Sequence, residues 1–182
     1  MSITTASRTA LPTGTWTLDP VHSSIGFEIE YMTGAFHGHF ADIDAKLVVD
    51  DGRARLSGSA RVASIQVKDE NLEAHLQSPD FFDAERHPEL RFEADEIDRS
   101  GDDISVRGEI TIKGVTKPVE LTGTIADPVV DAYGRERIGL RLEGTVDRTE
   151  FGVNWNLPLP DGRPALADEV KLTGELFFVQ EA

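Results

Sequence analysis

The stretch ISVRGEITIKGVTKPVELTGTI, residues 104–125, alternates apolar and polar side chains in two segments joined by a turn at Lys113-Gly114. A period of two is typical of β-strands that bury one face and expose the other. The same alternation recurs along most of the chain. This pattern indicates a fold of antiparallel strands joined by short hairpins, and it constrains the fold more than any other feature of the sequence.

The alternating segments and the turns between them give a set of expected elements. The turns carry Asp51-Gly52, Ser100-Gly101, Lys113-Gly114 and Tyr133-Gly134, whose residue types tolerate positive φ. We expect strands near residues 15–19, 24–32, 34–50, 53–67, 89–99, 102–113, 117–130, 135–148 and 168–180.

One segment, KDENLEAHLQSPDFFDAERHPEL, interrupts the β pattern. Asp69 is a suitable N-cap, and Leu72 and Leu76 lie four residues apart, on one face of a helix. We therefore expect a helix over residues 69–77, ended by Ser78-Pro79 and followed by a second short helix that carries the next two phenylalanines. Residues 149–167 are expected to form a long loop with one helical turn.

Glycine occurs repeatedly where a buried strand face should carry a large side chain. Five expected strands place a glycine in the apolar phase, namely Gly58, Gly108, Gly123, Gly144 and Gly174. The core of a β-sandwich needs large side chains there, because protein interiors are closely packed. In a barrel of about eight strands, glycine bends a strand at a corner or leaves room for a small ligand. The sequence thus favours a barrel, with both roles of glycine open.

An apolar cavity is the functional hypothesis that follows from these faces. Its lining would bury a hydrocarbon guest at about 0.8 kcal/mol per CH₂. Several aromatic residues lie outside the strand interiors, on segments that would close the mouths of a barrel; they line the cavity or only plug its ends. The candidate lining residues are Phe27, Ile29, Tyr31, Phe36, Phe40, Leu76, Phe81, Phe82, Phe92, Gly108, Ile110, Gly123, Leu142, Phe151 and Trp155.

Polar candidates are few. His75 on the expected helix and Arg148 at a strand end are candidates for a polar rim that contacts a ligand headgroup. Asp19 and His22 resemble an acid–base pair, but G-x-S-x-G is absent, and we expect His22 and Ser23 to bond to backbone groups where the first strand turns into the barrel. His37 and His39 share a strand face without an obvious third metal ligand. We expect no catalytic residue, no metal and no cofactor.

Composition excludes several classes of protein. The chain has 18 Lys and Arg against 33 Asp and Glu, a net charge of −15, which disfavours nucleic acid and anionic membranes as partners. Cysteine is absent, so disulfides and thiolate chemistry are excluded. Residues 1–14 are polar, without a signal-like or membrane-spanning apolar run, and predict a disordered lead-in to a single domain over residues 15–182. We expect a cytoplasmic protein.

Several motifs, taken in order along the chain, resemble those of the YceI-like, lipocalin-like polyisoprenoid-binding family. TWTLDPVHSSIGFEI is similar to the opening W-x-(I/L)-D-x-x-H-S-x-(I/V)-x-F, and GAFHGHF to V-x-G-x-F. VASIQVKDENLEAHLQSPDFFDAERHPELRFEA, VRGEITIKGVTKPVEL, VDRTEFGVNW and LADEVKLTGELFF resemble later blocks of that family. Together these segments cover residues 15–179.

This resemblance implies an all-β fold, an extended lipocalin-like antiparallel β-barrel of about eight strands with one or two short helices. It also implies a homodimer whose pore binds a long-chain polyisoprenoid, an isoprenoid quinone or a similar amphiphilic lipid. We therefore expect a non-enzymatic carrier that sequesters its ligand. Two alternatives remain: an enzyme that acts on a small hydrophobic substrate in the same cavity, and a dimer whose barrel is filled by its own side chains.

Overall fold

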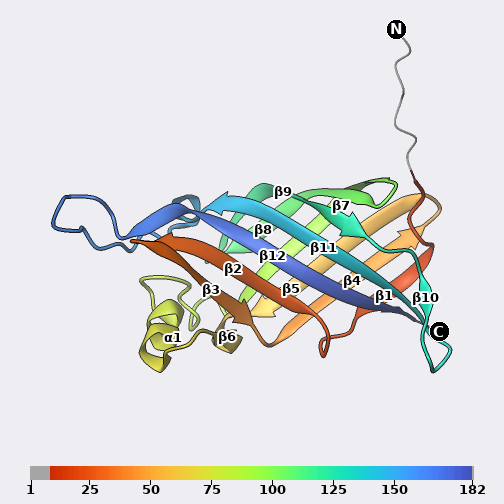
Figure 1. Ribbon diagram of the computed structural model, residues 1–182, viewed down its shortest axis with the longest axis horizontal. Helices are drawn as coiled ribbons and strands as arrows, with labels where there is room; N and C mark the ends of the chain where they lie inside the picture. The colour runs from red at the N-terminus through yellow and green to blue at the C-terminus, as the bar shows by residue number, and fades with distance from the viewer. Residues whose placement is uncertain (1–8, 182) are drawn as a thin grey trace, which may run out of the picture.

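The ring of strands predicted by the alternating pattern is present in the computed structural model, which describes residues 9–181 (Figure 1). Eight antiparallel strands follow one another around the ring, and the pairing of the last two closes it. The all-β barrel is thereby confirmed. In chain order the ring contains β1 (Gly14–Leu18), β4 (Ile43–Asp50), β5 (Arg53–Arg61), β7 (Glu89–Ser100), β8 (Asp103–Ile112), β9 (Val115–Ile125), β11 (Glu136–Asp147) and β12 (Leu166–Gln180).

Strand β12 is long enough to pair with two strands along one edge. Its last residues, Phe178 to Gln180, pair with β1, whereas Leu166 to Glu175 pair with β2 (Ser24–Tyr31). β2 pairs with β3 (Gly34–Phe40), and β3 pairs with β6 (Ile65–Gln66). These three strands therefore extend the wall of the barrel beyond the ring, at the end away from β1 (Figure 1).

Two expected strands are interrupted, and the two interruptions meet. The strand expected over residues 34–50 breaks after Phe40, where the backbone N–H of Asp42 donates to Ser64 Oγ at 3.0 Å. The strand expected over residues 53–67 breaks at the 3₁₀ helix η1 (Val62–Ser64). The buried positions change phase at both breaks, from Phe40 to Ile43 and from Val62 to Ile65, so each interruption shifts the inward face by one residue.

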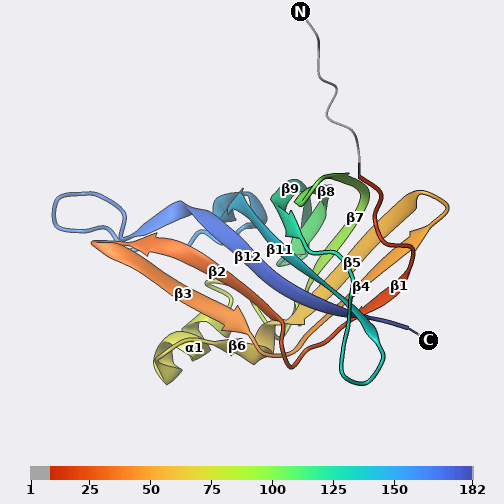
Figure 2. The same ribbon diagram turned by 45° about the vertical axis from the view of Figure 1, so that its right-hand side comes forward.

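Helix α1 (Glu70–Gln77) begins as expected, because Asp69 Oδ1 accepts a hydrogen bond from the backbone N–H of Leu72 at 3.0 Å. It lies beside β6 (Figure 2) and buries Leu76. The expected second helix is wrong, since residues 78–86 form successive turns. The 3₁₀ helix η2 (Arg148–Phe151) supplies the helical turn expected in the long loop, and β10 (Val129–Val130) pairs with β11.

Residues 9–13 precede β1 and are held against the barrel. The backbone N–H of Thr9 donates to the carbonyl of Arg99 at 2.9 Å, and Arg99 Nη1 donates to the carbonyl of Ala10 at 3.1 Å. Trp16 Nε1 donates to the carbonyl of Pro12 at 3.1 Å. The expected disordered lead-in thus does not extend to these residues, and its first part, residues 1–8, lies outside the described residues.

The barrel interior is filled at the end where β1 lies. Trp16, Leu47, Val106, Ile125 and Phe178 are all at most 2% exposed. We call these five side chains the floor. The outer face carries charged cross-strand pairs such as Arg141 with Glu175, at 3.0 Å. Within residues 9–181, no helix has the length and apolar character needed to cross a membrane.

Candidate functional site

A cavity of about 190 Å³ lies between the barrel strands and α1. Its volume exceeds the roughly 150 Å³ of an engineered apolar cavity that binds benzene. None of the floor residues lines it, so the barrel is filled at one end and hollow towards the other. The walls are almost entirely hydrocarbon, contributed by facing strands whose apolar side chains point inward.

Four phenylalanines form one side of the cavity. Phe27 on β2 lies 6.2 Å from Phe36 and 6.1 Å from Phe40, both on β3, measured between ring centroids. Phe82, from the turn segment after α1, lies 5.9 Å from Phe40 and 6.4 Å from Phe27. Edge contacts of this kind stabilise aromatic clusters beyond area burial. The extension of the wall by β2 and β3 thus gives the cavity its aromatic side.

The hollow end is bordered by α1, the turns of residues 78–88, η2 and the start of the loop of residues 152–165, and we call these segments together the end cap. Phe81 lines the cavity, and behind it the ring of His75 lies 5.0 Å from Phe81 and 4.7 Å from Trp155. His75 Nε2 is 3.0 Å from Asp80 Oδ2. Lys113 Nζ, from the β8–β9 turn, donates to the carbonyls of Pro79 and Gly152 at 2.6 and 3.2 Å.

Arg148 is the buried charged residue of the cavity wall, with only 5% of its side chain exposed. It follows β11 directly, in η2, and its guanidinium donates to the carbonyls of Val153, Trp155 and Ala167. It therefore holds the loop of the end cap to the start of β12. Burial lowers the pKa of Arg148, while the nearby Asp168 and Asp147 carboxylates oppose this effect.

Most residues predicted to line the cavity do so. The structure places in its wall Phe27, Ile29, Phe36, Phe40, Leu76, Phe81, Phe82, Phe92, Ile110, Leu142, Phe151 and Arg148. Tyr31, His75 and Trp155 do not line it. The Tyr31 ring packs against Phe36 at the end of β2 with 42% of the residue exposed, while His75 and Trp155 lie behind Phe81.

Gly108 and Gly123 also lie outside the wall, and the idea that they leave room for a guest is corrected by their surroundings. A Cβ at Gly108 would collide with the carbonyl of Glu93 and with Ala94 in the neighbouring strand. A Cβ at Gly123 would collide with the carbonyl of Arg141. These two glycines let adjacent strands approach closely at the corners of the barrel.

Two other glycines do leave space. Gly58 and Gly174 line the cavity, and a Cβ at either would meet no atom closer than 3.5 Å. The period-two pattern places both on the inner face, so the sequence holds this signal. Val153 and Leu166, which also line the cavity, lie in or beside a loop where no periodic pattern identifies them.

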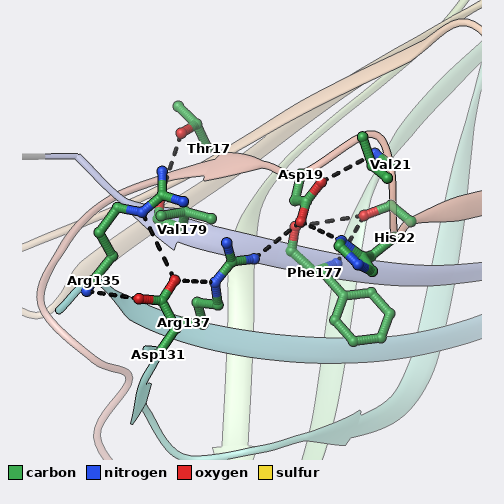
Figure 3. Close-up of polar contacts among 10 residues, drawn as sticks. Thr17, Asp19, Val21, His22, Asp131, Arg135, Arg137, Phe177 and Val179 are labelled. Atoms are coloured by element: carbon green, nitrogen blue, oxygen red, sulfur yellow. Dashed lines mark hydrogen bonds and ion pairs between the residues drawn. The ribbon is translucent and has the colours of Figure 1, made fainter. Parts of the chain in front are cut away.

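A second polar cluster lies at the opposite end of the barrel (Figure 3). Asp19 Oδ2 is 2.6 Å from His22 Nδ1 and accepts from Arg137 Nη1 at 2.9 Å. Arg137 Nε donates to Asp131 Oδ2 at 2.7 Å. Burial raises the pKa of Asp19, but hydrogen bonds from His22 and Arg137 outweigh it and lower the value to about 2.

The catalytic interpretation of this cluster lacks a nucleophile. Ser23 Oγ accepts from the backbone N–H of Phe177 at 2.9 Å, and no hydrogen bond joins it to His22 among the described residues. Neither Asp19 nor His22 lines the cavity. The cluster instead joins the β1–β2 turn to the β10–β11 hairpin.

The two strand histidines have separate partners. His39 Nε2 lies 2.9 Å from Gln66 Oε1, and His37 Nδ1 lies 3.8 Å from Glu28 Oε2. Over residues 9–181, no group of three or more His, Cys, Asp or Glu side chains is arranged to hold a metal ion.

Comparisons with known proteins address the whole domain. The model of the family described as YceI-like domain matches residues 16–178. A UPF0312 protein of Photorhabdus laumondii is 29% identical over 140 residues, which are 75% of this chain and 73% of that protein.

Two solved structures are similar in fold. The crystal structure of BcnA from Burkholderia cenocepacia aligns with a TM-score of 0.74 and 21% identity over 88% of this chain and 98% of that one. A polyisoprenoid binding domain from Saccharophagus degradans aligns with a TM-score of 0.69 and 12% identity over 91% of this chain and 98% of that one. At these identities the likeness is one of fold.

Proposed function

The chain belongs to the family of YceI-like domains, and on this premise we propose that it binds a long apolar molecule non-covalently inside its barrel. The ligand class is a polyisoprenoid, an isoprenoid quinone or a similar amphiphilic lipid. The role is sequestration and carriage, because the barrel replaces water around a chain that water solvates poorly.

The observation that carries the proposal is the hydrocarbon-lined cavity inside a closed barrel. Burial of ten methylenes in such a wall contributes on the order of 8 kcal/mol, against which association costs at least about 4 kcal/mol. A long tail therefore gains useful affinity from the wall with few polar contacts. The polyisoprenoid binding domain with the same fold supports this ligand class.

The end cap is the proposed route of entry. The end cap consists of a helix, turns and a loop rather than paired strands of the ring, whereas the other end of the barrel is filled by the floor. A ligand that reaches the cavity from the capped end displaces side chains such as Phe81 and Phe82 rather than breaking ladder hydrogen bonds of the ring.

The alternatives are less well supported. An enzyme in the same cavity would need reactive groups in a wall that is nearly all hydrocarbon, and the Asp19–His22 pair lies elsewhere. A barrel filled by its own side chains throughout is at odds with the cavity. We propose in addition that the protein is a homodimer in solution, which light scattering coupled to size-exclusion chromatography tests.

The proposed function is tested by purifying the native protein from cells and extracting it for lipid mass spectrometry. We expect a reproducible isoprenoid at close to one molecule per barrel. A second sample, stripped of lipid, should take up added geranylgeraniol. Absence of both a co-purifying lipid and any uptake would overturn the proposal.

A further inference from the structure

Within residues 9–181, two arginines have side chains that are at most 5% exposed, and their hydrogen bonding differs. Arg99 Nε donates to the carbonyl of Gly101, Nη1 to that of Ala10, and Nη2 to Asp127 Oδ1 at 2.6 Å. Each nitrogen of Arg99 thus has a partner. Arg99 does not line the cavity, and its role is to hold the segment before β1.

Arg148 uses only two of its three nitrogens in this way. Nε donates to the carbonyl of Ala167 at 2.8 Å, and Nη1 to the carbonyls of Val153 and Trp155 at 2.7 and 2.9 Å. Nη2 is buried without a hydrogen-bond partner within residues 9–181. Its nearest carboxylate, Asp168 Oδ1, lies 3.9 Å away and is 65% exposed, which is an ion pair beyond hydrogen-bonding distance.

A buried donor without a partner is costly, so its retention in a ligand cavity requires an explanation. The other charged residue in the wall, Arg91, is exposed and donates through Nε and Nη2 to Glu89. Arg148 is therefore the cationic group of the wall that retains an unused donor. Arg148 both lines the cavity and belongs to the end cap, so its unused donor lies near the capped end of the cavity.

We propose that Arg148 Nη2 binds an accepting oxygen on the polar end of the guest, so that the head lies under the end cap and the tail points towards the floor. This inference rests on the proposed function and adds to it a headgroup class: a carbonyl, carboxylate or phosphate oxygen on a long apolar chain. The wall would then select amphiphiles over hydrocarbons of the same skeleton.

The first test uses the native protein with two C20 isoprenoid probes, geranylgeranoic acid and the hydrocarbon phytane. Binding is followed by intrinsic tryptophan fluorescence, since Trp155 lies 5.4 Å from the cavity-lining Phe81. We expect the acid to bind roughly tenfold or more tightly, the effect of one charge-assisted hydrogen bond. Equal affinity for both probes would overturn the inference while leaving the proposed function intact; binding of neither would overturn the proposed function itself.

The second test changes the electrostatics at Nη2 without touching the wall. Asp168→Asn removes the distant carboxylate, and Glu169→Gln makes the same charge change at the next exposed residue. We expect Asp168→Asn to tighten acid binding by roughly twofold to fivefold and Glu169→Gln to leave it nearly unchanged. Phytane binding should not respond to either change. Equal effects of the two variants on the acid would contradict a role for Nη2.

The third test removes the donor itself. Arg148→Met should abolish the preference for the acid, whereas Arg99→Met, which removes an equally buried arginine away from the cavity, should preserve it. If Arg148→Met does not fold, because three carbonyls lose their donor, the comparison of Asp168→Asn with Glu169→Gln decides. A folded Arg148→Met protein that still prefers the acid would refute the inference.

Discussion

Leu142 on β11 lies between two glycines, opposite Gly123 on β9 and opposite Gly174 on β12. The two glycines look equivalent in the sequence, since both interrupt an apolar strand face. They are not equivalent in space. Gly123 faces the backbone of Arg141, so it allows two strands to come together, whereas Gly174 faces the cavity, so it makes room for a guest.

Gly174→Leu is expected to fill part of the cavity. A Cβ there would meet only the Leu176 side chain, at 3.8 Å, so the fold should be retained with a thermal midpoint near that of the native protein. Uptake of geranylgeraniol should fall at least tenfold, because the new side chain occupies the volume of several methylenes. Unchanged uptake in a folded variant would show that this part of the cavity does not contact the guest.

Gly123→Ala is expected to lower stability and to leave lipid binding nearly unchanged. The added Cβ would collide with the Arg141 carbonyl, so β9 and β11 must separate at this corner. Overpacking of this kind costs about 1–3 kcal/mol, which urea unfolding would measure. In the fraction that remains folded, lipid affinity should stay within about twofold of native. A variant as stable as the native protein would contradict the close approach described here.

At the scale of elements, a lysine of the β8–β9 hairpin helps to tie the end cap to the ring. Lys113 in the β8–β9 turn donates to Pro79 on one segment of the cap and to Gly152 on another. The ammonium group thus joins two segments that are distant in sequence. If the cap opens for ligand entry, these hydrogen bonds must break first.

Lys113→Met is expected to speed ligand release. Loss of two hydrogen bonds to a charged group lowers the cost of opening, and release of bound geranylgeraniol should be roughly threefold to tenfold faster by stopped-flow fluorescence. Lys117→Met is the matched control, because it makes the same charge change on the same hairpin. Identical release from native protein and Lys113→Met would place the entry route elsewhere.

The predictable part of this architecture is the part that repeats. The alternation in the stretch around Gly108 is sufficient to predict the strands, the hairpins and the inward faces. Asp69 is sufficient to predict the start of α1. The two interruptions do leave a trace, a change of phase in the buried positions between Phe40 and Ile43 and between Val62 and Ile65, which the expectation of continuous strands did not use. The distinction between Gly123 and Gly174 leaves none, because it depends on the neighbouring strand, which local sequence does not contain.

The candidate site likewise has a part that the sequence predicts and a part that it does not. Strand residues such as Phe27 and Ile110 were predicted to line the cavity because their phase is regular. Trp155 was predicted to line the cavity because it is an aromatic residue on a segment expected to close the barrel, and His75 was predicted to belong to a polar rim. The structure sets both behind Phe81. The unused nitrogen of Arg148 depends on where three loop carbonyls lie, which no pattern in the sequence specifies.

At the scale of the whole molecule, the two ends of the barrel have different chemistry. One end has the cap and the cavity, and the other has the floor and the polar cluster of Asp19, Arg137 and Asp131 (Figure 3). In that cluster the carboxylates of both aspartates have pKa values lowered to about 2, for Asp131 chiefly by the hydrogen bond from Arg137.

This cluster predicts a specific acid sensitivity. A carboxyl whose pKa is lower in the folded state contributes stability above its unfolded pKa of 3.8, and this contribution is lost as the pH falls through about 2. Asp19→Asn should therefore be less stable than native at pH 6, and the two should converge near pH 2 in urea unfolding. Asp50→Asn, at an exposed position, is the control and should follow the native curve. Parallel curves for native protein and Asp19→Asn would contradict the ionised pairing.

The floor has a consequence for the choice of guest. Trp16, Leu47 and Phe178 occupy the interior at a fixed depth, so the hollow has a definite bottom. A tail shorter than this depth leaves part of the wall uncovered, and a longer one must fold back or project through the cap. We therefore expect the proposed lipid binding to discriminate among homologous lipids by length, and smaller side chains at the floor positions should admit longer tails.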